Sequence, residues 1–227
     1  AAGAGALLAA RSSLQRHRKY DFRSKVVVIT GGSRGLGLVL ARELASEGAL
    51  IAICARDQQD LEDARSQVAE NGVDVFTAAC DLRNYGEVEA TVRKIVNHFG
   101  RIDILINNAG TIAVGPLETM TLDDYHEQMD SNFWSAVHMT TAILPEMRRQ
   151  RSGRIVNIAS IGGKVAVPHL LPYSASKFAL VGFSRGLRSE VLKDGIVVTT
   201  VCPGLMRTGR SRNADFKGGH RAEYAWF

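Results

Sequence analysis

The sequence predicts an α/β protein, a single domain in which a doubly wound parallel sheet lies between two layers of helices. Six short β-branched runs alternate with longer stretches of helical periodicity, which is the pattern of repeated βαβ units. The runs are apolar on both faces, as expected for strands of a parallel sheet that helices cover on both sides. A chain of 227 residues, 45% apolar and 22% charged, has the composition of one soluble domain.

Strands are expected where the β-branched runs lie, at residues 26–30, 50–55, 73–79, 102–107, 154–160 and 196–201. The stretches between them are long enough for crossover helices, expected at residues 36–47, 61–71, 85–99, 122–150 and 173–193. In a parallel sheet of this kind, ligands bind at the carboxyl ends of the strands. Residues that directly follow a strand are therefore the first candidates for a site.

An alanine-rich and then basic arm, residues 1–24, precedes this pattern. It is expected to be a flexible or helical lead-in; the alternative is the tail of a removed membrane anchor, with its basic residues on the cytoplasmic side. No run approaches the roughly 18 apolar residues that a membrane span needs. Both chain ends have the character of cuts rather than natural termini.

Composition also narrows the function classes. The cysteines, Cys54, Cys80 and Cys202, are odd in number and lack CxxC spacing, which favours a reducing compartment and a cytoplasmic protein. The histidines show no ligand spacing, so no metal site is expected. The formal charge of +5 gathers in two clusters without interleaved aromatic residues, so no nucleic-acid partner is expected.

A glycine-rich turn follows the first expected strand. The segment TGGSRGLG, residues 30–37, leads straight into a helical stretch. Glycines let the backbone turn tightly and approach a pyrophosphate, whose charge the helix N-terminus favours. The spacing is neither the GxGxxG fingerprint nor a P-loop. Its place after the first strand of a βαβ unit is what favours a dinucleotide site over ordinary turn chemistry.

The end of the second strand indicates which dinucleotide binds. A site for NAD usually offers a carboxylate there, about 20 residues beyond the glycines, to the adenosine ribose. Here the strand runs into Ala55 and Arg56, and Asp57 is better explained as the N-cap of the next helix. Arg56 and Arg34 together would form a permanently charged clamp for a 2′-phosphate. The sequence therefore predicts NADP(H) in preference to NAD(H).

Tyr173 and Lys177 lie four residues apart in YSASK, so on a helix they share one face, a single turn apart. A fixed cation favours the phenolate form of an adjacent tyrosine, which would let the phenol act as both acid and base. By itself the pair is typical of a surface helix. Pro172 suits the first turn of a helix and would help to fix where Tyr173 points.

Small or polar residues also follow the other expected strands, in CDLR at 80–83, NNAG at 107–110, NIAS at 157–160 and CPGLMRT at 202–208. Each motif is ordinary loop sequence when taken alone, because Asp81 could cap a helix and Pro203 could end a strand. At successive strand ends they together predict one continuous ligand site.

In this order the motifs resemble those of the short-chain dehydrogenase/reductase family, through TGGSRGLG, NNAG, Asn132 in a helical stretch, Ser160, YSASK and PGLMRT. The resemblance runs from about residue 25 to residue 208. It implies a Rossmann fold that moves a hydride between a nicotinamide cofactor and an alcohol or carbonyl carbon of a small-molecule substrate. It also implies a homo-oligomer, a dimer or a tetramer.

The resemblance implies a role for each matching residue. Tyr173 would be the acid/base, Lys177 would bind the nicotinamide ribose and favour the phenolate, Ser160 would hydrogen-bond the substrate oxygen, and Asn132 would hold the water of a proton relay. The implied cofactor-binding residues are Gly31, Ser33, Arg34, Leu36, Gly37, Arg56, Asp81, Leu82, Asn107, Ala109, Tyr173, Lys177, Pro203, Gly204 and Thr208. Alternatives stay open for two of them: Asn107 as a tie between strands, and Asn132 as the occupant of a local helix distortion.

The sequence departs from the family pattern after Thr208. The family continues into a helical substrate lid and a seventh strand, whereas only residues 209–227 follow here, so the catalytic domain, residues 25–227, is expected to be truncated. Two other functions compete with the oxidoreductase. One is a catalytically silent NADP(H)-binding sensor or scaffold, which the intact Ser160, Tyr173 and Lys177 disfavour. The other is an epimerase or dehydratase of the extended family, whose GxxGxxG glycine spacing is absent.

Overall fold

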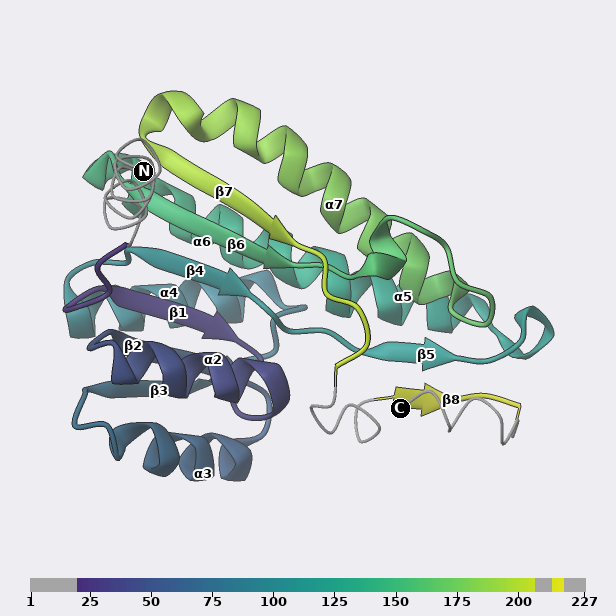
Figure 1. Cartoon of the computed structure of the whole chain (residues 1–227), viewed down its shortest axis with the longest axis horizontal. Coiled ribbons are helices and arrows are strands. Elements are labelled where there is room, and N and C mark those ends of the chain that lie inside the picture. Colours follow the sequence, from purple (N-terminus) through teal and green to yellow (C-terminus); the bar gives the residue numbers. More distant parts are fainter. Residues whose placement is uncertain (1–19, 207–213, 219–227) are drawn as a thin grey trace, which may run out of the picture.

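A six-stranded parallel sheet forms the centre of the molecule, as predicted (Figure 1). The computed structural model describes residues 20–206 and 214–218 of the chain. The strands lie in the order β3-β2-β1-β4-β6-β7, and all their pairings are parallel. Their bounds are β1 Val26–Thr30, β2 Leu50–Ala55, β3 Val75–Ala79, β4 Ile104–Asn107, β6 Gly153–Ile158 and β7 Ile196–Val201.

Helices cover both faces of this sheet, which gives the predicted three layers (Figure 1). Residues of α2 and α3 pack on one face, and residues of α4, α6 and α7 on the other. None of the helices in the described part of the chain is long and apolar enough to cross a bilayer. Their bounds are α2 Gly35–Ser46, α3 Gln58–Ala69, α4 Tyr85–Phe99, α5 Leu122–Met129, α6 Ser135–Gln150 and α7 Leu171–Val191.

The central strand β1 shows why the sheet needs both layers. Its residues Val26 and Val28 belong to the core under α4 and α6, whereas Val27 and Ile29 belong to the core under α2 and α3. All four side chains are fully buried. Successive side chains of a strand point to opposite faces, so a strand that is apolar at every position is stable only between two layers.

The expected helix at residues 122–150 is helical throughout but contains a π-helical turn, the local distortion left open above for Asn132. Helix α5 ends at Met129, a π-helical segment η2 spans Asp130–Trp134, and α6 begins at Ser135. A π-helical turn inserts one extra residue per turn and commonly lies at a functional site. The side chain of Asn132, at the centre of η2, is buried.

A second, two-stranded sheet lies beside the carboxyl ends of the main sheet and was not predicted. Strands β5 (Ile112–Val114) and β8 (Ala214–Phe216) pair in parallel, and the Lys217 backbone N–H extends the ladder to the Val114 carbonyl at 2.8 Å. The Lys217 ammonium bridges Asp124 at 3.1 Å and Asp215 at 2.9 Å. The bridge joins β8 to the first turn of α5.

Asp124 is expected to stabilise this corner in a pH-dependent way. Its carboxylate closes a capping box with Thr121 and accepts a hydrogen bond from the Lys217 ammonium. The hydrogen bond from the Thr121 backbone N–H has the largest effect, and together with the Lys217 and Thr121 side chains it holds the pKa of Asp124 below its ordinary value of 3.8. Asp124→Ala should lower the free energy of unfolding by roughly 1 kcal/mol at neutral pH. A carboxyl with a depressed folded-state pKa stabilises above its unfolded pKa, so the difference should shrink as pH falls through the folded-state value.

The control for this prediction is Asp123→Ala, because Asp123 is in the same first turn but exposed. Chemical denaturation of the wild type and both variants, from neutral pH down to below 3.8, measures the effect. Equal losses for both variants, or a loss for Asp124→Ala that does not change with pH, would contradict the role given to the capping box and the Lys217 bridge.

Candidate active site

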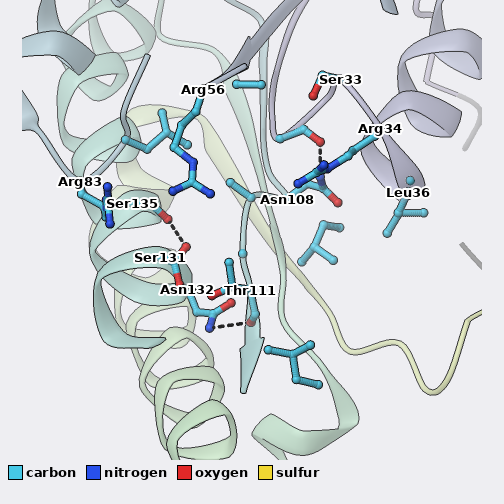
Figure 2. A pocket seen from close by; sticks show the side chains of 18 of the residues that line it. Ser33, Arg34, Leu36, Arg56, Arg83, Asn108, Thr111, Ser131, Asn132 and Ser135 are labelled. Carbon is cyan, nitrogen blue, oxygen red and sulfur yellow. Dashed lines mark hydrogen bonds between the residues drawn. The ribbon is translucent and has the colours of Figure 1, made fainter. Parts of the chain in front are cut away.

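A cavity of about 580 Å³ lies at the carboxyl ends of the strands, beside the neighbouring strands β1 and β4 (Figure 2). The chain leaves β1 toward β2 on one side, while β4 lies on the other, so this is the point at which the strand order reverses. Ligands of open α/β sheets bind at such a point. The volume falls in the range of small-molecule and cofactor pockets.

The glycine turn after β1 forms one wall of the cavity and fits closely against the loop after β4. Gly31 has a φ of 62°, and a Cβ atom there would lie 2.9 Å from the Ala109 Cα. The Asn108 amide donates to the carbonyls of Thr30 and Gly31, both at 3.0 Å. A side chain at Gly31 would fill the space between the two loops. Because glycine has none, the backbone of the turn before α2 stays uncovered by a side chain at this position.

Three arginines lie around the end of the cavity nearest β2 and β3, and Figure 2 labels all of them. Arg34 lies 3.5 Å from Asp60, and Arg83 makes a 2.6 Å ion pair with Asp81. Among the described residues, Arg56 has no ion-pair partner. Its charge is therefore the least compensated of the three.

The carboxylates near Arg56 are already engaged. Asp57 accepts a hydrogen bond from the Asp60 backbone N–H at 2.8 Å and so caps α3, as the sequence predicted. Hydrogen bonds from Arg83 hold the pKa of the Asp81 carboxyl below its ordinary value, so Asp81 is ionised at neutral pH. Burial raises the pKa of the Cys80 thiol beside them, which leaves the thiol protonated and a poor nucleophile.

Tyr173 and Lys177 project from the first turns of α7, where Pro172 occupies the position expected of it. The two side chains face one another, with the Lys177 ammonium 5.8 Å from the centre of the Tyr173 ring. Lys177 donates to the Ile158 carbonyl at the end of β6, at 3.2 Å. The buried Tyr173 hydroxyl has no hydrogen-bond partner among the described residues, and Tyr173 lines the cavity.

Ser160 reaches the same place from the end of β6. Its hydroxyl accepts from the Gly162 backbone N–H at 3.1 Å. A Cβ atom on Gly162 would lie 3.3 Å from the Tyr173 ring and 3.5 Å from the Ser160 hydroxyl, so the two residues flank one glycine. On Gly163 a Cβ atom would lie 2.6 Å from the Lys177 carbonyl oxygen. These two glycines let the loop after β6 approach α7 closely.

Asn132 approaches Lys177 from the π-helical segment. Its side-chain nitrogen donates to the Thr111 carbonyl and to Gln128, both at 3.1 Å, while its side-chain oxygen is buried without a partner among the described residues. A Cβ atom on Gly110 would collide with that oxygen and lie 3.4 Å from the Lys177 ammonium nitrogen. An acceptor and a cation therefore both lie on the side of Gly110 where a side chain would project, and glycine leaves room for them.

The structure brings most of the predicted site residues together around this cavity. Those that line it are Gly31, Ser33, Arg34, Leu36, Arg56, Asp81, Leu82, Ala109, Asn132, Tyr173 and Lys177. Ser160, Gly37, Pro203 and Gly204 do not line it, although Ser160 flanks Tyr173 and the Pro203 carbonyl accepts from Ile161 at 2.9 Å. Thr208 lies outside the described residues.

Asn107 does not line the cavity, so its predicted place among the cofactor-binding residues is corrected in favour of the alternative, a tie between strands. Its side chain is buried and donates to Asn157 at 2.8 Å and to Thr140 at 3.1 Å, so it links β4 to β6 and α6 instead of lining the cavity. The next residue, Asn108, lines the cavity in its place. Arg83 and Gly110, which belong to the predicted strand-end motifs CDLR and NNAG, also line the cavity. Four further lining residues were not predicted, namely Thr111, Ile112, Ser131 and Ser135.

These features fit a nicotinamide dinucleotide. Bare glycine backbone at a helix N-terminus suits a pyrophosphate, and cationic side chains lie at the far end of the cavity. At the opposite end, the Tyr173 hydroxyl and the Asn132 side-chain oxygen are buried without hydrogen-bond partners among the described residues.

A sequence model described as short chain dehydrogenase matches residues 25–217. The chain belongs to the short-chain dehydrogenase family. Within this family, a protein of Streptomyces coelicolor whose name provisionally assigns it to the ketoacyl reductases is 38% identical over 187 residues, 82% of this chain and 72% of its own. The human dehydrogenase/reductase SDR family member 7 is 35% identical over 204 residues, 88% of this chain and 60% of its own.

Two solved structures with a similar fold contain different nicotinamide cofactors, NADPH in one and NAD⁺ in the other. A variant of actinorhodin polyketide ketoreductase with NADPH has a TM-score of 0.79 and 38% identity, covering 82% of this chain and 72% of its own. An NAD⁺-bound xylitol dehydrogenase has a TM-score of 0.78 and 34% identity at the same coverage. The protein is thus an oxidoreductase of a family that uses nicotinamide cofactors.

Proposed function

We propose that this short-chain dehydrogenase interconverts an alcohol and a carbonyl compound with NADP(H), and that Tyr173 transfers the proton. The observation that carries the proposal is that Tyr173, Lys177 and Asn132 line one end of a cavity, with Ser160 beside Tyr173, while the other end holds Arg56, which has no ion-pair partner among the described residues. The relative assigned to the ketoacyl reductases and the NADPH-bound ketoreductase named above support the same reaction class.

The bound cofactor supplies or accepts the hydride at the substrate carbon. In the reducing direction Tyr173 donates its hydroxyl proton to the carbonyl oxygen as the C=O π bond breaks. The Lys177 ammonium stabilises the phenolate that remains, and the Ser160 hydroxyl donates a hydrogen bond to the oxygen on which charge develops. The unpartnered Asn132 oxygen would accept from a water that returns a proton toward Lys177 and Tyr173. In the oxidising direction each proton moves the opposite way.

The substrate is proposed to be apolar around its reacting group. Tyr173 belongs to a cluster of apolar side chains that includes Ile112 and Val114 of β5, Leu170 before α7 and Phe216 of β8. Their surfaces would exclude water from the bond that reacts, which strengthens the interaction of the developing charge with Ser160 and Lys177. A hydrophobic ketone or secondary alcohol fits these surroundings better than a highly charged substrate.

The preference for NADP(H) follows from Arg56, with Arg34 as its neighbour. The Arg34–Asp60 contact is long and largely exposed, so little free energy is lost when Arg34 turns to a phosphate. Asp57 Oδ1 accepts the capping hydrogen bond of α3, so fewer acceptor sites of this carboxylate remain for the ribose hydroxyls of NAD. A 2′-phosphate would instead meet two guanidinium groups.

The proposal is tested by titrating the full chain with NADPH and with NADH, with binding measured by fluorescence. Arg56→Met should weaken NADPH binding by roughly 10- to 100-fold, the value of a hydrogen bond to a charged group, and leave NADH binding nearly unchanged. The matched control is Arg65→Met, since Arg65 is exposed on α3 and does not line the cavity. Tighter binding of NADH than of NADPH by the wild type would rule out the assignment of Arg56.

Turnover is tested separately with a panel of hydrophobic ketones in the presence of NADPH. Consumption of NADPH with any of these ketones supports the oxidoreductase proposed here. Tight cofactor binding without turnover across the panel would favour the silent sensor or scaffold instead.

A further inference from the structure

Gln128 is a buried polar residue to which the function proposed above gives no role. It lies in the last turn of α5, one turn before Asn132, and only 3% of it is exposed. Its side-chain oxygen accepts from the Asn132 side-chain nitrogen at 3.1 Å, and its nitrogen donates to the Thr111 hydroxyl at 3.0 Å. Burying an amide costs free energy unless such bonds are made. Both ends of the Gln128 amide are therefore used, and both contacts lead to residues that line the cavity.

The direction of each hydrogen bond around Gln128 follows from one backbone carbonyl. The Ser131 hydroxyl donates its single proton to the Glu127 carbonyl at 2.8 Å, because a carbonyl can only accept. The Thr111 hydroxyl lies 2.7 Å from the Ser131 hydroxyl oxygen, so Thr111 must be the donor of that bond. Since its own proton is used in this way, the Thr111 oxygen accepts from Gln128. The Gln128 nitrogen is therefore fixed toward Thr111, and the Gln128 oxygen toward Asn132.

The same series of bonds fixes the orientation of the Asn132 amide. Its nitrogen donates one proton to the Gln128 oxygen and the other to the Thr111 backbone carbonyl, a bond that Figure 2 shows as a dashed line. Both acceptors would repel the Asn132 oxygen if the amide were reversed. The Asn132 oxygen consequently faces Gly110, on the side where the Lys177 ammonium lies, with no partner among the described residues.

This orientation decides whether Asn132 can take part in a proton path. An oxygen beside an ammonium group can accept a hydrogen bond from the cation or from a water that the cation contacts. The amide nitrogen in the same place would present protons to a group that has only protons to give. An asparagine has nearly the same shape in both orientations, so packing alone does not choose between them. The choice has to come from hydrogen bonds, and Gln128 supplies one of the two.

We propose that Gln128 is a positioning residue of the active site, which holds the Asn132 oxygen toward Lys177 and so keeps a proton path open. The inference rests on the proposed function, because the path is needed only if Tyr173 exchanges protons during turnover. Gln128 does not line the cavity itself and acts through Asn132. The two hydroxyls beside it set the direction in which its amide points.

The first test needs no turnover. In the protein without cofactor, the side-chain amide of Asn132 gives a pair of ¹H–¹⁵N resonances, which Asn132→Ala identifies by their absence. Gln128→Met is close in size but has no amide, so it should move one of the two proton resonances upfield. Unchanged resonances would show that the bond between Gln128 and Asn132 is absent in solution and would overturn the inference, whether or not the protein reduces a ketone.

The second test is reduction of a hydrophobic ketone at saturating NADPH. Gln128→Met should lower kcat by roughly 2- to 10-fold, the value of one hydrogen bond, while the affinities for NADPH and the ketone stay nearly unchanged. The solvent deuterium isotope effect on kcat should rise, because proton transfer then limits the rate more strongly. Gln128→Glu should lose less than Gln128→Met, because a carboxyl oxygen can still accept from Asn132. Thermal melting checks that both variants fold.

Gln150→Met is the matched control for the loss of a glutamine amide. The Gln150 nitrogen donates to the Ile102 carbonyl at 2.8 Å, just ahead of β4 and at the opposite end of the sheet from the cavity. This variant should lose stability but keep wild-type kcat and the wild-type isotope effect. A fall in kcat equal to that of Gln128→Met would show that loss of stability alone lowers turnover, and it would overturn the positioning role.

A double-mutant cycle shows whether Gln128 acts through Asn132. In the Asn132→Ala background, Gln128→Met should have little further effect on kcat. Equal losses in both backgrounds, a loss matched by weaker NADPH binding, or full turnover of Asn132→Ala would each overturn the inference. The proposed function fails in a different way, since the wild type would then reduce none of the ketones. In that case the amide resonances still decide whether Gln128 orients Asn132.

Discussion

Replacement of Tyr173 by phenylalanine is expected to lower kcat by roughly 100- to 10,000-fold, the contribution of a positioned general acid, while the affinity for NADPH changes little. The hydroxyl that is removed has no hydrogen-bond partner among the described residues, so its loss leaves no donor or acceptor of the protein unsatisfied. The free energy of unfolding should therefore stay within about 1 kcal/mol of the wild type. The variant separates chemistry from both folding and cofactor binding.

The measurement is single-turnover reduction of a hydrophobic ketone by protein saturated with NADPH. Tyr85→Phe is the control, because Tyr85 lies at the start of α4 and does not line the cavity. The control should keep wild-type rates. Unchanged turnover in Tyr173→Phe would show that another group supplies the proton, and the mechanism given to α7 would be wrong.

The sheet was predictable because its signal is local and repeated. Each strand of the main sheet is an apolar β-branched run with turn residues after it, and the observed bounds differ from the expected ones by no more than two residues at either end. The small sheet of β5 and β8 gives no such signal. Its strands are three residues long, and they pair across about 100 residues of chain, so nothing in either segment alone indicates a partner.

Hydrophobic periodicity also does not specify the π-helical turn within the expected helix at residues 122–150. Its hydrophobic periodicity continues through Asp130–Trp134, and the π-helical turn is stabilised by contacts that periodicity does not report. Asn132 bonds to the Thr111 carbonyl in a different loop, and Ser135 bonds to the Ser131 carbonyl one turn earlier. A tertiary contact decides this local conformation, so the sequence could offer a distortion at Asn132 only as an alternative.

The candidate site was predictable as a set of strand ends but not always to the residue. Motifs after successive parallel strands must meet at one edge of the sheet, so their convergence follows from the order of elements alone. The two asparagines of NNAG show the limit. Adjacent residues at a strand end point to opposite sides, and the sequence does not say which one faces the ligand. Asn107 faces the interior and Asn108 faces the cavity.

Gly37 carries the second large prediction. It lies in the first turn of α2, and a Cβ atom there would collide with the Gly31 carbonyl oxygen and lie 2.6 Å from the Asn108 side-chain nitrogen. Because the neighbouring atom of Gly31 is backbone, the glycine turn itself would have to move. Gly37→Ala should therefore lower the free energy of unfolding by roughly 1–3 kcal/mol and weaken NADPH binding by more than about tenfold.

The predicted loss of stability in Gly37→Ala is informative because helix propensity alone predicts a gain when alanine replaces glycine in a helix. Alanine is favoured over glycine inside a helix by roughly 1 kcal/mol, so a helical glycine with open space around it should gain stability on substitution. Gly182 provides that comparison, because it is exposed in the middle of α7 and a Cβ atom there would meet no other atom within 4 Å. Denaturant unfolding and NADPH titration of Gly37→Ala and Gly182→Ala should give opposite changes in stability, with cofactor affinity lost only in the first. If both variants gained stability and kept NADPH, the close approach of α2 to the glycine turn would have no role in shaping the cofactor site.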